Sequence, residues 1–272
     1  MKAKAYAKLN LSLYITGARG GMHTLDSVMH SVDLGDVLTV EEADSVSVIM
    51  HGADCPEERN TAYRAAIAVR DRYGLSLRTE IEKRIPSGGG MGGSSADAAG
   101  VLYCAERLLA ERGTPSDLSV IAAKIGSDVM YMMRGGCARV MGTGESIERL
   151  SSLDFTALVI DCGAVDTAEC YRMFDKLGLP VSNDGEAAVR VIESGRASAF
   201  ANDLYAPACR LNGRLSECGD IAAKCGLKAV MTGSGGCMFI LNAPPESEEC
   251  FTEHGFRCFS VHSVPNGVKI IG

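Results

Sequence analysis

The most informative segment of this 272-residue chain reads Pro86-Ser87-Gly88-Gly89-Gly90-Met91-Gly92-Gly93-Ser94-Ser95-Ala96-Asp97. Before it, residues 75–81 alternate between apolar and polar side chains, which predicts a strand. After it, apolar residues between 98 and 109 recur at helical spacing. Glycine allows a close approach of the main chain and positive φ angles, and the first N–H groups of a helix attract anions. The order strand, glycine loop, helix therefore predicts a phosphate-binding loop.

Three other interpretations of this loop fit the sequence less well. A flexible linker would not lie between two periodic elements. A P-loop ends in Gly-Lys-Ser/Thr, and this tripeptide does not occur in the sequence. Gly88, Gly90 and Gly93 satisfy the dinucleotide pattern G-x-G-x-x-G, but that fold needs an acidic residue after the next strand, about 20 residues on. Glu106 and Glu111 instead fall inside the predicted helix.

The charge of the chain limits its partners. The 27 Lys and Arg residues against 34 Asp and Glu residues give a net charge of −7. This balance argues against binding to nucleic acid or to an anionic membrane through a general positive field. The 31 glycines exceed the number that an average composition predicts, about 19. An anionic ligand must therefore be held locally, and glycine-rich main chain is the candidate for holding it.

The eleven cysteines show no C-x-x-C spacing, which argues against a zinc site and a redox dithiol. We expect them to be reduced and mostly buried as small apolar side chains. The N-terminal residues contain no apolar run of signal-peptide length, because Lys4, Lys8 and Asn10 interrupt it. No segment approaches the length of a membrane span. We therefore expect a cytoplasmic protein with no membrane partner and no nucleic-acid partner.

The periodicity along the chain predicts an α+β fold. Residues 5–15 alternate as a half-buried strand, with Lys8 and Asn10 on one face. Asn60 is the expected N-cap of a helix. The pattern changes beyond Arg149, which predicts an N-terminal domain over 1–150 and a C-terminal domain over 151–272. Further expected strands are 37–41, 46–50, 157–161, 229–232, 237–241 and 256–261, and further expected helices are 118–125, 168–178, 185–194 and 213–226.

The glycine-rich segment resembles the P-x-x-x-G-[LM]-G-x-S-S-[AG] loop of the galactokinase, homoserine kinase, mevalonate kinase and phosphomevalonate kinase superfamily. Four other segments narrow the resemblance to the 4-diphosphocytidyl-2-C-methyl-D-erythritol kinase family within it: Ala7–Leu11, Leu34–Asp36, Ile125–Val129 and Thr232–Cys237. The resemblance implies a two-domain small-molecule kinase fold, with a ribosomal-protein-S5-like N-terminal domain and a ferredoxin-like C-terminal domain. It also implies transfer of the γ-phosphoryl group of ATP to the 2-hydroxyl of the diphosphocytidyl methylerythritol.

The resemblance also implies roles for individual residues. Lys8 and Asp128 match the catalytic pair, and Asn10 matches its neighbour on the substrate side. Asn60 and Lys83 match positions near the adenine end of the nucleotide. The expected nucleotide-binding loop consists of Pro86, Ser87, Gly88, Gly89, Gly90, Met91, Gly92, Gly93, Ser94, Ser95 and Ala96.

The chemistry of the proposed catalytic residues is reasonable without the resemblance. Phosphoryl transfer needs a carboxylate that accepts the hydroxyl proton and groups that offset negative charge. Ser94 or Ser95 offers a hydroxyl to the phosphates or to the Mg²⁺ that accompanies ATP, or caps the helix. From the residues alone, a solvated turn aspartate is the preferred interpretation of Asp128 and an exposed strand lysine that of Lys8, and the agreement of the motifs reverses this preference.

The sequence departs from the family at the substrate end. The family usually has Gly-Tyr-His after the first strand, whereas this chain has Gly21, Met22 and His23. The resemblance assigns His23 to cytosine and Tyr171 to stacking on it, while an ordinary loop histidine and a core tyrosine are the plain alternatives. Met22 keeps open a kinase of the same fold for another small alcohol, of the homoserine or mevalonate type. A non-catalytic nucleotide-binding protein is the third hypothesis, and the oligomeric state stays open.

Overall fold

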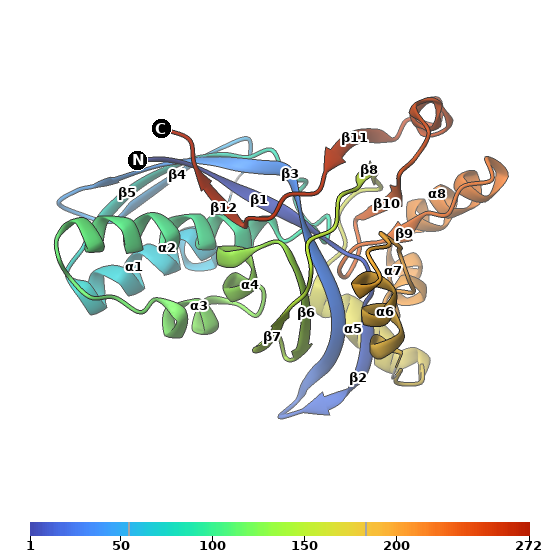
Figure 1. Cartoon of the computed structure of the whole chain (residues 1–272), viewed down its shortest axis with the longest axis horizontal. Coiled ribbons are helices and arrows are strands. Elements are labelled where there is room, and N and C mark those ends of the chain that lie inside the picture. The colour runs from blue at the N-terminus through green and yellow to red at the C-terminus, as the bar shows by residue number, and fades with distance from the viewer. Residues whose placement is uncertain (54, 183) are drawn as a thin grey trace.

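One long strand, β3 (Met22–Glu42), organises the first sheet of this computed structural model, which describes residues 1–53, 55–182 and 184–272. Along its length β3 pairs in turn with β2, β6, β1 and β5, always antiparallel. The other strands of the sheet are β1 (Lys2–Asn10), β2 (Tyr14–Arg19), β4 (Ser47–His51), β5 (Leu77–Glu82), β6 (Cys137–Gly142), β7 (Ser146–Arg149) and β12 (Val268–Ile270). The hairpin of β2 and β3 extends away from the rest of this sheet (Figure 1).

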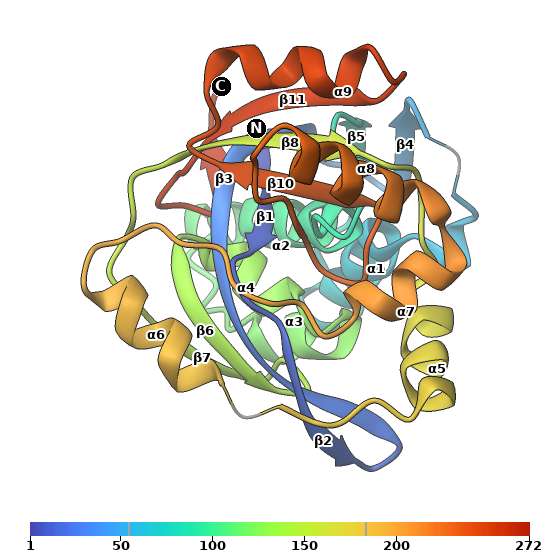
Figure 2. The same cartoon turned by 90° about the vertical axis from the view of Figure 1, so that its right-hand side faces the viewer.

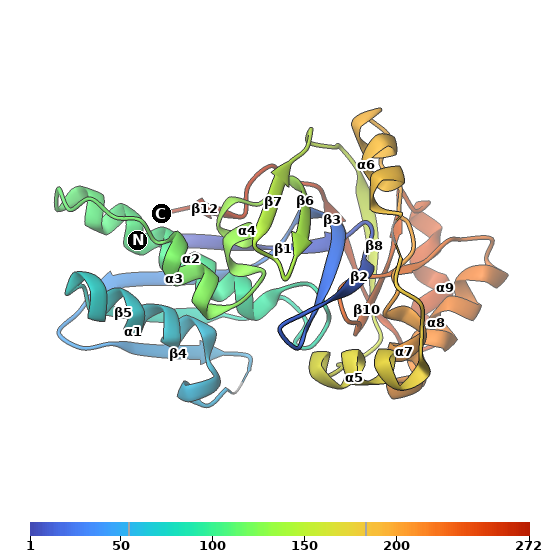
Figure 3. The ribbon, with the colours of Figure 1, turned by 90° about the horizontal axis from the view of Figure 1, so that it is seen from below.

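Helices cover one face of the first sheet (Figures 1 and 3). They are α1 (Thr61–Tyr73), α2 (Gly93–Glu111), α3 (Ser119–Ile125) and α4 (Val129–Arg134), with a 3-10 turn at Glu57–Arg59 before α1. The small residues Ala98, Ala99 and Ala105 are fully buried on α2, so this helix packs closely against β1 and β3. The main chain that enters α2 is the glycine loop predicted from the sequence.

The second sheet has the order β11-β8-β10-β9 and lies beside the end of β1 (Figure 2). Its strands are β8 (Thr156–Asp161), β9 (Val230–Met231), β10 (Cys237–Leu241) and β11 (Arg257–His262). The helices of this part are α5 (Thr167–Leu177), α6 (Gly185–Glu193), α7 (Tyr205–Leu211), α8 (Gly213–Lys224) and α9 (Glu249–Thr252), the last preceded by a 3-10 turn at Pro245–Glu248.

The α+β prediction is confirmed, and most predicted elements agree with the structure to within a few residues. The prediction of one half-buried strand over 5–15 is wrong in two respects. The strand ends at Asn10, because Leu11 and Ser12 turn to donate to the carbonyl of Val28. Residues 5–15 are also buried on both faces, so Lys8 is not an exposed strand lysine. Helix α2 packs on β1, Lys8 N donates to the Met91 carbonyl of the glycine loop, and Leu13 and Ile15 belong to the second hydrophobic cluster.

The C-terminal residues return to the first sheet. Strand β12 pairs with β1, and the Lys2 N–H donates to the Gly272 carbonyl at 2.6 Å, so both termini lie at the same edge (Figure 1). The chain after residue 150 is therefore not confined to the second sheet. The domain boundary near residue 150 stays a prediction. Among the described residues, no helix is long and apolar enough to span a bilayer.

Candidate active site

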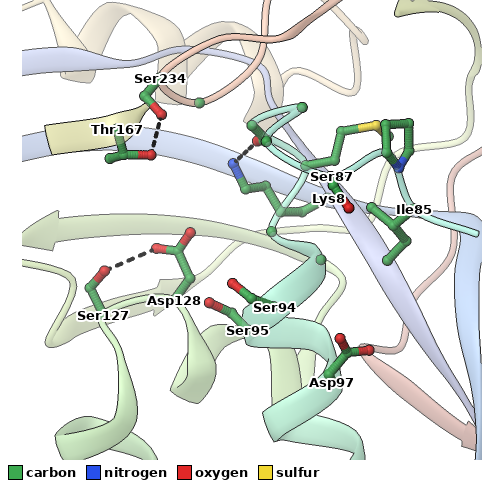
Figure 4. A pocket seen from close by; sticks show the side chains of 18 of the residues that line it. Lys8, Ile85, Ser87, Ser94, Ser95, Asp97, Ser127, Asp128, Thr167 and Ser234 are labelled. Carbon is green, nitrogen blue, oxygen red and sulfur yellow. Dashed lines mark hydrogen bonds between the residues drawn. The ribbon is translucent and has the colours of Figure 1, made fainter. Parts of the chain in front are cut away.

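A cavity of about 620 Å³ lies where the glycine loop, β1, α5 and the segment before α4 meet. Figure 4 shows Lys8, Asp128, Ser94 and Ser95 around this opening, with Thr167 and Ser234 above them. Of the predicted nucleotide-loop residues, 86–95 line the cavity, whereas Ala96 is buried in α2. The structure thus brings most of the predicted site residues into one place.

The glycine loop holds an unusual main-chain conformation. Gly88, Gly90 and Gly92 have φ angles of +65°, +71° and +77°, which residues with a Cβ rarely adopt. The carbonyl oxygens of Gly88, Gly89 and Gly90 accept hydrogen bonds from Val165 N at 3.2 Å, Cys237 N at 3.1 Å and Lys8 Nζ at 2.6 Å. With its carbonyl groups held by the rest of the protein, the loop can offer its amide groups to an anion.

Helix α2 begins at Gly93, directly after the loop, and its N-cap residue Gly92 makes no side-chain cap. Ser94 and Ser95 therefore lie in the first turn, and the alternative that one of them is the N-cap is wrong. Because the first N–H groups of a helix have no intrahelical acceptor, this turn provides further anion donors beside the loop. Both serines line the cavity.

A second glycine-rich segment, Thr232–Cys237, packs main chain to main chain on the first. A Cβ on Gly90 would overlap the Thr232 carbonyl oxygen, and a Cβ on Gly236 would overlap that of Gly88. A Cβ on Gly233 would lie 2.5 Å from the carbonyl oxygen of Gly90. The two segments fix each other at a spacing that only glycine permits.

Lys8 is almost fully buried, with 3% of its surface exposed. Its ammonium donates to the Gly90 carbonyl and to the Asn10 side chain. Burial lowers the pKa of Lys8, and the nearby Asp128 carboxylate opposes this shift. Asp128 is half-buried and precedes α4, with its carboxylate 3.5 Å from the Ser127 hydroxyl. Lys8 and Asp128 are thus electrostatic neighbours across the cavity.

Asn10 lies beneath the cavity and connects its walls. Its side-chain amide donates to Ser27 Oγ at 2.8 Å, and its Oδ1 accepts from Gly233 N at 2.8 Å as well as from Lys8. With 1% of its surface exposed, Asn10 supports the position of Lys8 and of the second glycine segment.

Besides Asn10, the predicted acceptor-binding residues are His23 in the β2–β3 hairpin and Tyr171 on α5. The rings of His23 and Tyr171 stack with 5.0 Å between centroids and an interplanar angle of 25°. His23 Nε2 lies 2.8 Å from an oxygen of Asp175. Among the described residues that line the cavity, Tyr171 is present and His23 is not. Met22 is 60% exposed at the hairpin.

The two residues predicted near adenine are engaged within the protein. Asn60 is the N-cap of α1, as predicted, and its Oδ1 accepts from the N–H groups of Ala62 and Tyr63. Lys83 lines the cavity, but its ammonium is paired with Asp36 and Asp97. Nothing in these contacts shows a nucleotide role for either side chain.

Known proteins resemble this chain over almost its whole length. Residues 60–140 match the family model of the GHMP kinases N terminal domain. A 4-diphosphocytidyl-2-C-methyl-D-erythritol kinase of Pelotomaculum thermopropionicum is 37% identical, covering 90% of both chains. One of Desulfitobacterium hafniense is 34% identical, covering 97% of this chain and 96% of the relative. The chain belongs to the 4-diphosphocytidyl-2-C-methyl-D-erythritol kinase family.

Solved structures agree with membership in this kinase family. A crystal structure of a 4-(cytidine 5'-diphospho)-2C-methyl-D-erythritol kinase superposes with a TM-score of 0.80 at 31% identity, covering 97% of this chain and 99% of the other. A homoserine kinase from Cytophaga hutchinsonii superposes with a TM-score of 0.69 at 17% identity, covering 100% and 97%, and so shares the fold alone. The predicted small-molecule kinase fold and ATP-dependent kinase class are confirmed.

Several residues at the site of this family member were not assigned a role from the sequence. Thr167 and Ser234 place two hydroxyl groups 2.7 Å apart at the cavity, and Asp175 holds His23. Asp36 and Asp97 surround Lys83. Ser234 and Asp36 lie in segments that carried the resemblance, so the motif was visible in the sequence although their contacts were not.

Proposed function

We propose that this chain transfers the γ-phosphoryl group of ATP to the 2-hydroxyl group of 4-diphosphocytidyl-2-C-methyl-D-erythritol, a step of the non-mevalonate route to isoprenoids. Similarity to the kinases of this compound over nine tenths of the chain supports the assignment. The observation that carries it is the meeting of Asp128, Lys8 and the glycine loop at one cavity.

Asp128 is the proposed general base. Its carboxylate accepts the proton of the 2-hydroxyl while the hydroxyl oxygen bonds to the γ-phosphorus. The bond between the γ-phosphorus and the oxygen that bridges it to the β-phosphate breaks, which releases ADP. The low-dielectric wall around Lys8 strengthens the field of its ammonium at this point. We assign Lys8 to fixing the Gly90 carbonyl and to placing a positive charge beside the Asp128 carboxylate and the transferring phosphoryl group.

The residues at the cavity fit a nucleotide-borne magnesium ion. Mg²⁺ keeps several waters and binds phosphate oxygens with one or two protein oxygens. The hydroxyls of Ser94 and Ser95 are the oxygens that would hold it, and the ion would neutralise charge on the phosphates.

The acceptor alcohol is proposed to reach the cavity beside α5. Tyr171 offers an aromatic face for the cytosine ring, and His23 is the polar group beside it. Met22 stands where the family usually has tyrosine, and a thioether still makes favourable contacts with a ring. This substitution supports the second candidate, a kinase of the same fold for another small alcohol.

ADP release separates these candidates. Purified protein with Mg-ATP is offered diphosphocytidyl methylerythritol, mevalonate or homoserine in parallel. The proposal predicts turnover on the first substrate only. Turnover on mevalonate or homoserine without turnover on the first would establish the second candidate. Absence of turnover on all three, with intact ATP binding, would favour a non-catalytic nucleotide-binding protein.

A further inference from the structure

A buried cluster of charges lies under the ends of the glycine loop. It consists of Asp36 on β3, Lys83 after β5 and Asp97 in α2, whose side chains are 0%, 7% and 4% exposed. Lys83 Nζ donates to an oxygen of each aspartate, at 2.6 Å for Asp97.

The first carboxylate fixes the start of the loop. Asp36 Oδ1 accepts from the N–H groups of Arg84 and Ile85 at 2.6 and 2.9 Å, directly before Pro86. These bonds determine the direction in which the main chain leaves β5. Because Asp36 is fully buried within the long strand β3, the start of the loop is attached to the most extensive element of the first sheet.

The second carboxylate fixes the end of the loop. Asp97 lies one turn into α2, and its Oδ2 is the acceptor for Lys83. A Cβ on Gly93 would lie 3.6 Å from Lys83 Nζ, so the ammonium sits against the first residue of the helix. One lysine therefore joins the strand that enters the loop to the helix that leaves it.

We propose that Asp97 is a positioning residue for nucleotide binding, because through Lys83 it holds the two ends of the glycine loop at the separation that directs the loop amides to the phosphates. This inference rests on the proposed function of the loop. A loop that is ordered before binding does not have to be ordered by the nucleotide, and the affinity gains accordingly.

The ionisation of the cluster is consistent with this role. Two carboxylates and one ammonium leave one excess negative charge in a buried site, which is costly. Burial, with a smaller contribution from Asp36, raises the pKa of Asp97 to about 8 against the opposing effect of Lys83. Burial lowers the pKa of Lys83, but Asp97 and Asp36 outweigh this and the net shift is upward. A neutral Asp97 beside a charged Lys83 keeps the hydrogen bond and removes the excess charge.

A neutral Asp97 that accepts from Lys83 predicts different outcomes for two substitutions. Asp97→Asn keeps a neutral side chain of the same shape that still accepts from Lys83, whereas Asp97→Leu keeps the volume and removes the acceptor. Arg139→Met is the matched control, because it breaks another largely buried ion pair, with Asp26, away from the loop.

The experiment is calorimetric titration with a non-hydrolysable ATP analogue, together with the melting temperature and the KM of each substrate. We expect Asp97→Leu to weaken nucleotide binding about tenfold, with Asp97→Asn within about threefold of wild type and the acceptor KM unchanged in both. Arg139→Met should lower the melting temperature and leave the nucleotide Kd unchanged. If Asp97→Leu does not fold, Asp97→Ser, too short to reach Lys83, takes its place.

The outcomes separate this inference from the proposed function. Wild-type protein that fails to bind the analogue contradicts the function of the loop itself. Wild-type protein that binds, with an Asp97→Leu variant of equal nucleotide affinity, overturns the positioning role. A parallel rise in both KM values that follows the loss of melting temperature would also overturn the positioning role. Failure of both the Asp97→Leu and the Asp97→Ser variants to fold would do the same, because either result assigns the cluster to folding alone.

Discussion

The nucleotide side and the acceptor side of the cavity are built differently. The nucleotide side is formed mainly by main-chain groups: glycines with positive φ, and carbonyls that accept hydrogen bonds from Lys8 and Cys237. A buried charge cluster lies beneath them. The acceptor side is formed by side chains: His23 and the exposed Met22 on the β2–β3 hairpin, and Tyr171 on α5, whose ring stacks on that of His23. The comparison suggests a phosphate site formed before binding and an acceptor site that side-chain substitution can alter.

The largest expected effect is at Asp128, where the two sides meet. Asp128→Asn should lower turnover roughly 10²–10⁴-fold, because the proton of the acceptor hydroxyl loses its base. Affinity for the ATP analogue should stay near wild type, since the glycine loop is untouched. The measurement is steady-state ADP release beside calorimetry. Retention of more than a few per cent of kcat would show that Asp128 is not the base.

The next largest effect is expected from a substitution that disrupts the main-chain packing on the nucleotide side. Gly90→Ala places a Cβ onto the Thr232 carbonyl, so the loop must shift, and we expect nucleotide binding to weaken about a hundredfold. Gly113→Ala is the control: its φ of +68° carries the same strain, but nothing lies within 4 Å of the added Cβ. Calorimetry of both variants separates overlap from backbone strain. Equal nucleotide affinities in the two variants would contradict the close packing of the glycine segments.

A substitution on the acceptor side should have a smaller effect on substrate binding than Gly90→Ala has on nucleotide binding. Tyr171→Ala removes the proposed stacking surface and should raise the KM of diphosphocytidyl methylerythritol about tenfold, the usual order for loss of one base–aromatic stack. The KM of Mg-ATP should not change. Initial rates at varied concentrations of each substrate provide the measurement. An unchanged acceptor KM would make Tyr171 a packing residue of α5.

The fourth prediction concerns stability. The pKa of Asp97 rises from 3.8 to about 8 on folding, so its contribution to stability is fully present below the lower value and is lost as the pH rises through the higher one. Asp97→Asn has no such loss. Denaturant unfolding at pH 5 and at pH 8 should therefore show the variant gaining free energy of unfolding relative to wild type as the pH rises. A difference independent of pH would contradict the neutral state of Asp97.

The smallest effect should restore a family feature. Met22→Tyr replaces an exposed thioether by the aromatic ring usual at this place, and we expect the acceptor KM to fall about threefold. The nucleotide KM is the internal control. A higher acceptor KM would indicate that this chain binds its alcohol differently from its relatives.

The same contrast explains what could be predicted from the sequence. Periodicity and glycine content predicted the strand, loop and helix around residues 86–97, because these are local properties of the chain. The burial of Lys8 was not predictable, since it depends on the glycine loop more than 80 residues away, where its ammonium donates to Gly90. The length of β3 depends on pairing in turn with β2, β6, β1 and β5, which is also long-range. Asp36 lies 47 residues from Lys83, so their contact carries no local signal.

The most direct test of the central claim, that the two sides are built independently, is the nucleotide affinity of the acceptor-side variant. Calorimetric titration of Tyr171→Ala with the ATP analogue, in the absence of alcohol, should give a Kd within about twofold of wild type, because the substitution leaves the hydrogen bonds of the glycine loop in place. A nucleotide affinity that falls as far as the affinity for the alcohol would show that the phosphate loop is not formed in advance, and would contradict the account.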